Sequence, residues 1–503
     1  MSISLLLEMA SSEHPDRLAV TSGETRLTVS ELSDLADRAA GVIAGSGARH
    51  VAYVGTGGHL QPLLIFAAAR ACVPYTPVNY RLAAEGVQEL LDRLNDPLVI
   101  VDPGYREVVG DRLRPAQDCN EFLLTARAGE PHAEFADPDS VAIVLFTSGT
   151  TSKPKAVELS HANLTSYITQ TVEFSSAEPT DAALVCVPPY HIAGVNAPLS
   201  NLYAGRRVVY LPQFDAGQWL RLAVEEHITT ATVVPTMLDR IVAELHAHPT
   251  TLPALRNLAY GGSKVALPLV RKALQLMPDV GFVNAYGLTE TSSTIAVLTP
   301  DDHREALGST EPAVAKRLGS VGRPVPGVEI QVRAKDGTPV AANLTGELFV
   351  RGDQVSGRYA GLGSVLDESG WFPTRDLATV DDDGYLYIVG RSDDTIIRGG
   401  ENIAPAEIED VLIEHPDVRQ VAVVGVEDPQ WGQIIVAVVV PEPASAPDAD
   451  ELREFVRGSL RGSRTPDRIV FRDELPVTPT GKVVRRDIVT SLLDERTKAA
   501  SHG

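Results

Sequence analysis

The segment FTSGTTSKPKAVELSH (146–161) gathers hydroxyl groups, a glycine and a lysine directly after an apolar run typical of a buried strand. The residues that could hold a polyphosphate there are Thr147, Ser148, Gly149, Thr150, Thr151 and Lys155. Glycine lets backbone N–H groups turn toward an anion, and hydroxyl and ammonium groups add further donors. The segment is not a P-loop, because no Gly-Lys-Ser/Thr follows at the required spacing. A solvated Ser/Thr-rich turn has a similar composition, so this segment alone favours phosphate binding only modestly.

The segment NAYGLTETSST (284–294) places an aromatic ring, a hydroxyl group and a carboxylate close together. An adenine could pack on Tyr286, and Thr289 could meet a phosphate oxygen. Glu290 could hold a magnesium ion, which prefers hard oxygen ligands. Glu290 also suits the N-terminus of a helix, where the helix dipole stabilises an acid, and the two roles are compatible.

Two later segments carry single charged residues that indicate a function only in combination with other residues. WFPTRDLATVDDDGYLYIVGRSDD (371–394) holds Asp376 and Arg391, each near the end of a predicted strand. A carboxylate can accept two hydrogen bonds from a ribose diol, and a guanidinium can brace ribose or phosphate. Lys482 follows Pro-Thr-Gly in PVTPTGKVVRRDI (476–488), which we expect to end the folded part of the chain. Alone, each would more often be a structural or solvated charge.

Alternating strands and helices must position these residues. Apolar, β-branched runs predict strands at 50–55, 97–102, 140–146, 183–188, 207–211 and 231–235. Amphipathic patterns predict helices at 27–47 and 60–72. This alternation implies βαβ units and largely parallel sheets. Beyond about residue 317, short strands broken by Gly, Pro and Asp-Gly indicate a small antiparallel sheet or barrel.

The last part of the chain reads as a separate compact unit. Helices are expected at 406–416 and 451–460, with two strands between them. The polar turn from Arg391 to Asp394 is the predicted boundary, which divides the chain into residues 1–391 and 392–503.

Composition limits the partners. The net charge is −22, so nucleic acid and anionic membrane surfaces are poor partners. Three scattered cysteines (Cys72, Cys119 and Cys186) do not suit a disulfide framework or a metal cluster. The apolar runs 141–146 and 434–440 cannot span a bilayer, and the N-terminus lacks the basic start of a signal peptide. We therefore expect a cytoplasmic protein.

In this order, the segments resemble the adenylate-forming superfamily of acyl-CoA synthetases, aryl-CoA ligases, firefly-type luciferases and stand-alone adenylation domains. The resemblance covers almost the whole chain. It includes AAARACVPYTPVNYRL (67–82), PPYHIAG (188–194), YGGSKV (260–265), GELFVRG (346–352) and GRSDDTIIRGGENIAPAEIE (390–409). It implies an α/β fold: a large N-terminal domain of two parallel-rich sheet subdomains and a small antiparallel β-barrel, then a small mobile α+β C-terminal domain.

The resemblance also implies a role for each candidate residue. The phosphate grip would be Thr147, Ser148, Thr150, Thr151 and Lys155, and the adenine slot Gly261, Gly262 and Tyr286. Thr289 would contact the α-phosphate, Glu290 the Mg²⁺, Asp376 the ribose diol, and Arg391 matches the arginine after the last strand of the large domain. Asp393 matches the hinge, and Lys482 the lysine that bridges carboxylate and α-phosphate.

The implied reaction has two steps. ATP and a carboxylic acid would give an acyl-adenylate and pyrophosphate, and a thiol, expected to be that of coenzyme A, would then displace AMP. Rotation of the small domain about Asp393 would withdraw Lys482 and present Gly399 and Gly400 for the second step.

The resemblance assigns the acid pocket to three segments. One wall would be His191, Ala193, Gly194 and Asn196, facing Gly262, Lys264, Gly287 and Leu288. His191 is as well explained by a packed wall residue as by a contact with the carboxylate. No Asp in PPYHIAG could anchor an amino group, and Asp215 suits a helix N-cap better. Lys264 is the only candidate, and a weak one, to attract an acidic substrate. An apolar or aryl acid of modest size is therefore expected.

Three positions depart from the family pattern, which has glycine where this chain has Ser152, Ala156 and Arg375. Three alternatives therefore stay open: thioester formation only from a supplied adenylate, transfer to a carrier-protein phosphopantetheine, and a nucleotide-binding protein without turnover. Nothing distinguishes a luciferase-type oxygen pocket. The oligomeric state, including a homodimer, is not determined by the sequence.

Overall fold

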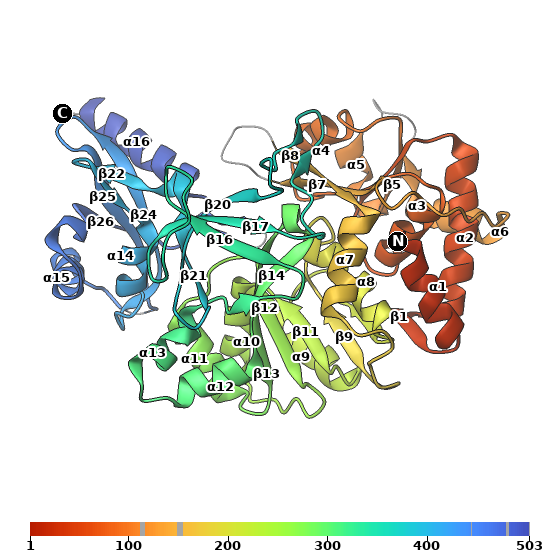
Figure 1. Ribbon diagram of the computed structural model, residues 1–503, viewed down its shortest axis with the longest axis horizontal. Helices are drawn as coiled ribbons and strands as arrows, with labels where there is room; N and C mark the ends of the chain where they lie inside the picture. The colour runs from red at the N-terminus through yellow and green to blue at the C-terminus, as the bar shows by residue number, and fades with distance from the viewer. Residues whose placement is uncertain (111–115, 148–153, 444, 479–481, 502–503) are drawn as a thin grey trace.

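The computed structural model describes residues 1–110, 116–147, 154–443, 445–478 and 482–501 (Figure 1). Two mixed sheets and one antiparallel sheet form the large N-terminal domain, and a smaller α+β domain follows. None of the helices in these ranges is long and apolar enough to cross a membrane.

The first large sheet is parallel through its centre, from β1 to β13. Its strands, in spatial order, are β15 (Arg323–Pro324), β14 (Ser293–Leu298), β13 (Gly281–Leu288), β12 (Asn257–Gly261), β11 (Thr230–Val233), β9 (Ala182–Val185), β10 (Arg207–Tyr210), β1 (Leu18–Ser22) and β2 (Thr25–Thr28). The antiparallel strands lie at its two edges.

The second large sheet is parallel from β7 to β6 and antiparallel at its other end. Its order is β19 (Gly363–Ser364), β18 (Arg358–Tyr359), β8 (Lys155–Ser160), β7 (Val141–Thr147), β4 (Tyr75–Val78), β3 (His50–Val54), β5 (Pro97–Val101) and β6 (Gln117–Asp118). This arrangement brings β18, which lies far along the sequence, beside the predicted phosphate segment.

Helices connect and cover the two sheets. They are α1 (Ser4–Glu13), α2 (Val29–Ser46), α3 (Leu60–Arg70), α4 (Ala84–Leu91), α5 (Arg106–Val109), α6 (Cys119–Ala128), α7 (His161–Thr171), α8 (Ile192–Tyr203), α9 (Ala216–Glu225), α10 (Pro235–Ala247), α11 (Leu267–Leu276), α12 (Pro300–Gly308) and α13 (Pro312–Lys316). Every residue of α3 is buried, and one continuous apolar core joins it to strands of both sheets. The two subdomains therefore form a single rigid support, because burial of apolar surface holds them together.

The third sheet of the large domain is fully antiparallel, in the order β16 (Glu329–Arg333), β17 (Gly346–Arg351), β20 (Phe372–Val380) and β21 (Leu386–Arg391). The predicted barrel is not confirmed, because this strand order is a linear path with β16 and β21 at opposite edges. The register of β20 and β21 pairs Asp376 with Arg391.

The small domain has its own sheet and its own core. Its elements are β22 (Ile396–Arg398), β23 (Glu401–Ile403), α14 (Pro405–Leu412), β24 (Val418–Asp428), β25 (Gly432–Pro441), α15 (Ala449–Ser459), β26 (Arg468–Phe471) and α16 (Arg485–Ser501). Two apolar clusters, one on each face of the β24–β25 pair, consist only of residues after 395. A short 3-10 turn, Ser392–Asp394, connects this domain to β21.

The predicted strands and helices are confirmed, each within a few residues of its expected ends. The prediction that folded structure ends near residue 488 is wrong, because α16 continues to Ser501. Ile488 and Leu492 on this helix are buried against the sheet, and that burial stabilises the segment.

Candidate active site

The carboxyl ends of the neighbouring parallel strands β12 and β13 form the floor of the site. Ligands of open α/β sheets commonly bind at such an edge. Gly261 ends β12, and a Cβ atom there would lie 2.1 Å from the carbonyl oxygen of Ala285. A Cβ atom on Gly287 would lie 1.8 Å from the carbonyl oxygen of Ser293. Only glycine permits these close approaches, so the backbone itself shapes the floor.

Asp376 lies buried at the centre of a hydrogen-bonded group. The Tyr286 hydroxyl donates to Asp376 Oδ2 at 2.5 Å, and Arg391 Nη1 lies 3.2 Å from Asp376 Oδ1. Burial raises the pKa of the Asp376 carboxyl, while Arg391, the Tyr286 hydroxyl and Lys482 act in the opposite direction. Burial and the Asp376 charge raise the pKa of Tyr286 well above its usual range, so its hydroxyl remains a donor.

Glu290 and Lys155 meet through a third residue, Tyr359. The Tyr359 hydroxyl donates to Glu290 Oε1 at 2.8 Å, and Lys155 Nζ lies 5.3 Å from the centre of the Tyr359 ring. Burial, followed by the Glu290 charge, raises the pKa of the Tyr359 hydroxyl, and Arg391 opposes this rise. Because Arg391 also pairs with Asp376, the two groups belong to one site.

Lys482 of the small domain joins the same site. Loss of solvent around the Lys482 ammonium group lowers its pKa, and the charge of Arg391 lowers it further. The charges of Asp376 and Asp394 oppose this decrease. The side chain keeps exposed surface, so solvent screening limits these effects. The domain arrangement therefore brings the predicted catalytic lysine close enough to Asp376 and Arg391 for their charges to interact.

The phosphate segment is described only at its two ends. Thr147 closes β7, Lys155 opens β8, and the two residues are paired across the strands. The predicted residues Ser148, Gly149, Thr150 and Thr151, and the departure at Ser152, lie outside the described residues. Ala156 is buried in β8, where a side chain fits the strand.

The predicted acid-pocket wall lies at the start of α8. Burial and the nearby Arg81 charge lower the pKa of His191 to about 4, so its imidazole is neutral near pH 7. Its Nε2 atom has no hydrogen-bond partner among the described residues. Ala193 and Gly194 follow in the first turn of α8.

Asn196, predicted to contact the substrate, forms a hydrogen bond within the protein. Its Nδ2 donates to the Ser292 carbonyl oxygen at 2.5 Å. Asn196 therefore anchors α8 to the turn that carries Thr289 and Glu290, a 3-10 helix over Thr289–Thr291. Leu288, directly before this turn, packs against the core beneath the antiparallel sheet.

Lys264, predicted to line the acid pocket, has a partner that this prediction did not include. Its ammonium group lies 2.6 Å from Asp410 Oδ1 and 2.7 Å from Asp410 Oδ2, across the boundary between the domains. Lys264 therefore forms an ion pair with a carboxylate of α14. Gly262, two positions earlier, lies on the floor of the site and has a φ of +86°.

The predicted hinge and thiol-step residues lie on the small-domain side. Asp393 is exposed in the 3-10 turn between the domains. Gly399 and Gly400 form the tip of the β22–β23 hairpin with φ values of +58° and +86°. Both glycines are exposed, and neither is part of the group around Asp376.

Tyr359 is the main site residue that the sequence analysis missed. It stands in GRYAG (357–361), between GELFVRG (346–352) and the segment 371–394, and belongs to neither. Its importance comes from the pairing of β18 with β8, which places Tyr359 opposite Val157. No local pattern encodes such a long-range strand pairing, so the spacing of residues gave no signal.

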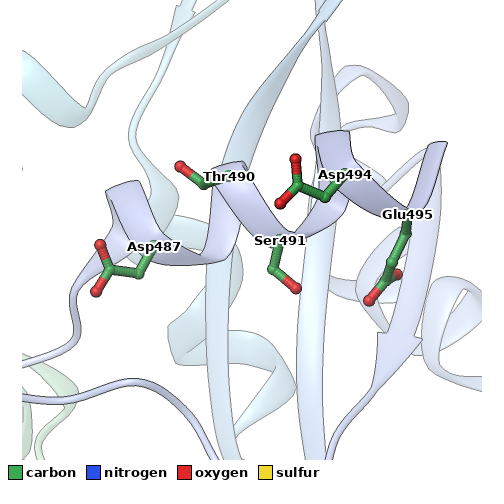
Figure 2. A pocket seen from close by; sticks show the side chains of 5 residues that line it. All are labelled: Asp487, Thr490, Ser491, Asp494 and Glu495. Carbon is green, nitrogen blue, oxygen red and sulfur yellow. The ribbon is translucent and has the colours of Figure 1, made fainter. Parts of the chain in front are cut away.

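A separate hollow lies on α16, the last helix of the small domain, and shares no residue with the candidate active site. Figure 2 shows its lining side chains, Asp487, Thr490, Ser491, Asp494 and Glu495. Its carboxylates would repel a triphosphate or an acid, so this hollow does not suit anionic substrates.

The donor set of the site fits a nucleotide triphosphate with Mg²⁺. In the described ranges, no three or more His, Cys, Asp or Glu side chains are arranged to hold a metal ion. Mg²⁺ usually takes one or two carboxylates together with substrate phosphates, and Glu290 supplies such a carboxylate. Lys155, Arg391 and Lys482 supply the positive charge that phosphates require.

The comparisons with known proteins agree with this geometry. Models of the AMP-binding enzyme and of the AMP-binding enzyme C-terminal domain match residues 7–360 and 407–482. An indoleacetate–CoA ligase of Aromatoleum aromaticum is 32% identical, over 99% of both chains. A feruloyl-CoA synthase of Amycolatopsis is 34% identical, over 94% of this chain and 96% of that protein. The o-succinylbenzoate CoA synthetase of Bacillus subtilis, solved with its acyl-adenylate intermediate, superposes with a TM-score of 0.84 at 26% identity, over 96% of this chain and 97% of that one. The chain therefore belongs to the AMP-binding enzyme family.

Proposed function

We propose that this enzyme joins a carboxylic acid to the thiol of coenzyme A in two steps, with ATP converted to AMP and pyrophosphate. The observation that carries the proposal is the Asp376–Arg391 ion pair, whose charges act on Lys482 and on the Tyr359 hydroxyl. That hydroxyl donates to Glu290, and Lys155 lies over the same ring. These residues come from both domains and from distant parts of the chain. Together they offer a carboxylate for ribose, a carboxylate for Mg²⁺ and cations for phosphate.

In the first step, a carboxylate oxygen of the substrate attacks the α-phosphorus of ATP and the bond to the β-phosphate oxygen breaks. The acyl-adenylate forms and pyrophosphate leaves. Carboxylate and triphosphate repel each other, so positive charge must be fixed along the line of attack. Lys482 would supply it at the carboxylate and α-phosphate, and Lys155 at the leaving pyrophosphate. A Mg²⁺ held by Glu290 would neutralise further phosphate charge.

In the second step, the thiol sulfur attacks the carbonyl carbon of the adenylate, the bond to AMP breaks, and the thiol proton is released. The thiol needs the space that Lys482 fills, so the small domain must turn. We place the hinge at Asp393, with residues 1–391 on one side and 392–503 on the other. Gly399 and Gly400 would then line the approach of the thiol, because their lack of side chains leaves room near the adenylate.

The acid is proposed to be an aryl or apolar acid whose only charge is the reacting carboxylate. Two observations support this class. His191 in the predicted wall is neutral near pH 7, because its pKa is lowered to about 4. Lys264, the other basic candidate, is paired with Asp410. The indoleacetate and feruloyl substrates named for the two relatives have this character.

A panel of carboxylic acids tests the proposal. Each acid is assayed for acid-dependent exchange of labelled pyrophosphate into ATP and for formation of a CoA thioester. Aryl acids such as indoleacetate and ferulate are expected to support both activities, and dicarboxylates of similar size to be at least tenfold poorer in kcat/KM.

Two results would count against the proposal. Thioester formation from a synthetic acyl-adenylate without pyrophosphate exchange would restrict the enzyme to the second step. Exchange with transfer only to a carrier-protein phosphopantetheine would replace coenzyme A as the acceptor.

A further inference from the structure

Two ion pairs join the large domain to the C-terminal end of the small-domain helix α14 and the turn after it. Lys264 Nζ contacts both carboxylate oxygens of Asp410, at 2.6 and 2.7 Å. Arg271 Nη1 on α11 lies 3.7 Å from Glu414 Oε2, just past the end of α14. Asp410 lies near the C-terminus of α14 and Glu414 in the turn that follows it, so both carboxylates belong to the same end of this helix.

Charge complementarity continues beside these pairs. Burial raises the pKa of the Asp239 carboxyl on α10, and Arg419 of the small domain is the first of the cations that oppose the rise. Two cations and a carboxylate of the large domain thus face two carboxylates and a cation of the small domain. At each of these positions, the two domains carry charges of opposite sign.

A chain of contacts leads from Lys264 to the catalytic lysine. Glu409, the neighbour of Asp410 on α14, accepts hydrogen bonds from Arg485 at 2.5 and 3.0 Å. Arg485 stands three positions after Lys482 and also lies 3.5 Å from Asp394 in the interdomain turn. The position of α14 therefore fixes the segment that carries Lys482.

Lys264 is also tied to the nucleotide floor. It follows Gly261 and Gly262 in the loop after β12. The same short loop thus shapes the predicted adenine slot and holds α14. Nucleotide binding and the position of the small domain act on a common segment.

We propose that Lys264 and Asp410 are positioning residues for adenylation, because their ion pair holds the small domain where Lys482 reaches the nucleotide site. This inference rests on the proposed two-step function. The pair joins two bodies that must turn apart for the thiol step, so it stabilises one domain arrangement and not the other. Lys264 and Asp410 are 50% and 58% exposed, so the pair is weak enough to break in every cycle.

Charge reversal tests the proposal. Lys264→Glu and Asp410→Lys each turn attraction into repulsion, and each is expected to lower the kcat of pyrophosphate exchange by about tenfold. Thioester formation from a synthetic acyl-adenylate is expected to stay at or above the wild-type rate, because release of the small domain becomes easier. The double variant restores attraction with the charges exchanged, and its exchange rate is expected to return to within about threefold of wild type.

Asp450→Lys is the matched control. Asp450 pairs with Arg453 on its own helix, α15, at 3.1 Å, so it carries the same charge change without an interdomain partner. Its two half-reactions are expected to match wild type. Thermal unfolding of all variants shows whether folding is preserved.

The outcomes separate this inference from the proposed function. Absence of pyrophosphate exchange in the wild-type enzyme would contradict the proposed function itself. An active wild type with normal exchange in Lys264→Glu would overturn the positioning role. Failure of the double variant to recover, together with a raised KM for the acid in Lys264→Glu, would also overturn it and return Lys264 to the acid pocket.

Discussion

Arg375 shows how one departure from the family pattern is accommodated. It occupies a position where the pattern has glycine, and its φ is +65°, in the region that disfavours side chains. Its side chain is exposed, and its Nε atom lies as far as 4.0 Å from Glu347 Oε1. This loose, solvent-screened contact does little to offset the backbone strain. The next residue, Asp376, is nevertheless buried and fully engaged. The protein therefore keeps Asp376, the proposed ribose-binding acid, in place at a cost in backbone strain.

Replacing Arg375 by glycine should relieve that strain. Arg375→Gly is expected to raise the free energy of unfolding by about 0.5–1 kcal/mol, because glycine loses the left-handed penalty but gains entropy in the unfolded chain. Urea unfolding measures the change. Arg375→Ala keeps a Cβ atom and should give no such gain. An equal gain in both variants would show that the side chain, rather than the backbone, is the source.

At this scale, the family resemblance assigned residues whose charges alone gave little signal, and the residues defined by packing were missed. Of the predicted residues, Glu290 accepts a hydrogen bond from Tyr359, Asp376 pairs with Arg391, and the Asp376 charge acts on Lys482. Tyr359 was missed because strand pairing brings it there. Lys264 was assigned to the pocket from its loop, but a carboxylate from the other domain engages its ammonium group. Ion pairs between domains cannot be predicted from the residues that neighbour each charge in the sequence.

At the scale of elements, the junction of β12 and β13 leaves no room for a side chain at Gly261. Gly261→Ala would place a Cβ atom 2.1 Å from the Ala285 carbonyl oxygen, which is backbone and cannot swing aside. We expect this change to lower the free energy of unfolding by about 1–3 kcal/mol and to weaken ATP binding, because the floor of the site must move. Urea unfolding and equilibrium titration with ATP measure the two effects.

Gly45→Ala is the matched control for this substitution. Gly45 lies within α2, and a Cβ atom there would meet nothing within 4 Å. Alanine is the better helix former, so a small gain in stability is expected. A Gly261→Ala variant as stable as wild type would contradict the close approach of these two strands.

The periodicity of the sequence was informative where elements are regular and buried. Strands such as β3 and β7 are short apolar runs between turns, so their patterns were clear. The barrel prediction followed from Gly and Pro punctuation, which marks short strands but not whether a sheet closes. α16 was missed because a polar helix near the end of the sequence resembles a solvated tail until its packing partners are known.

The whole molecule places a cationic site within an acidic protein. The net charge is −22, yet Lys155, Arg391 and Lys482 surround the position proposed for the phosphates. Local cations in a partly enclosed site act at short range, where the distant surface charge is screened. The site is complete only when both domains contribute. In the proposed mechanism, domain position therefore decides which of the two half-reactions the enzyme performs.

The most direct test of this account is to measure both half-reactions in Lys482→Ala. Pyrophosphate exchange is expected to fall by at least a hundredfold, because the charge at the carboxylate and α-phosphate is lost. Thioester formation from a synthetic acyl-adenylate is expected to remain within about threefold of wild type, because Lys482 has left the site at that stage. Equal loss of both activities would contradict the assignment of Lys482 to adenylation alone, and with it the two-arrangement account of the enzyme.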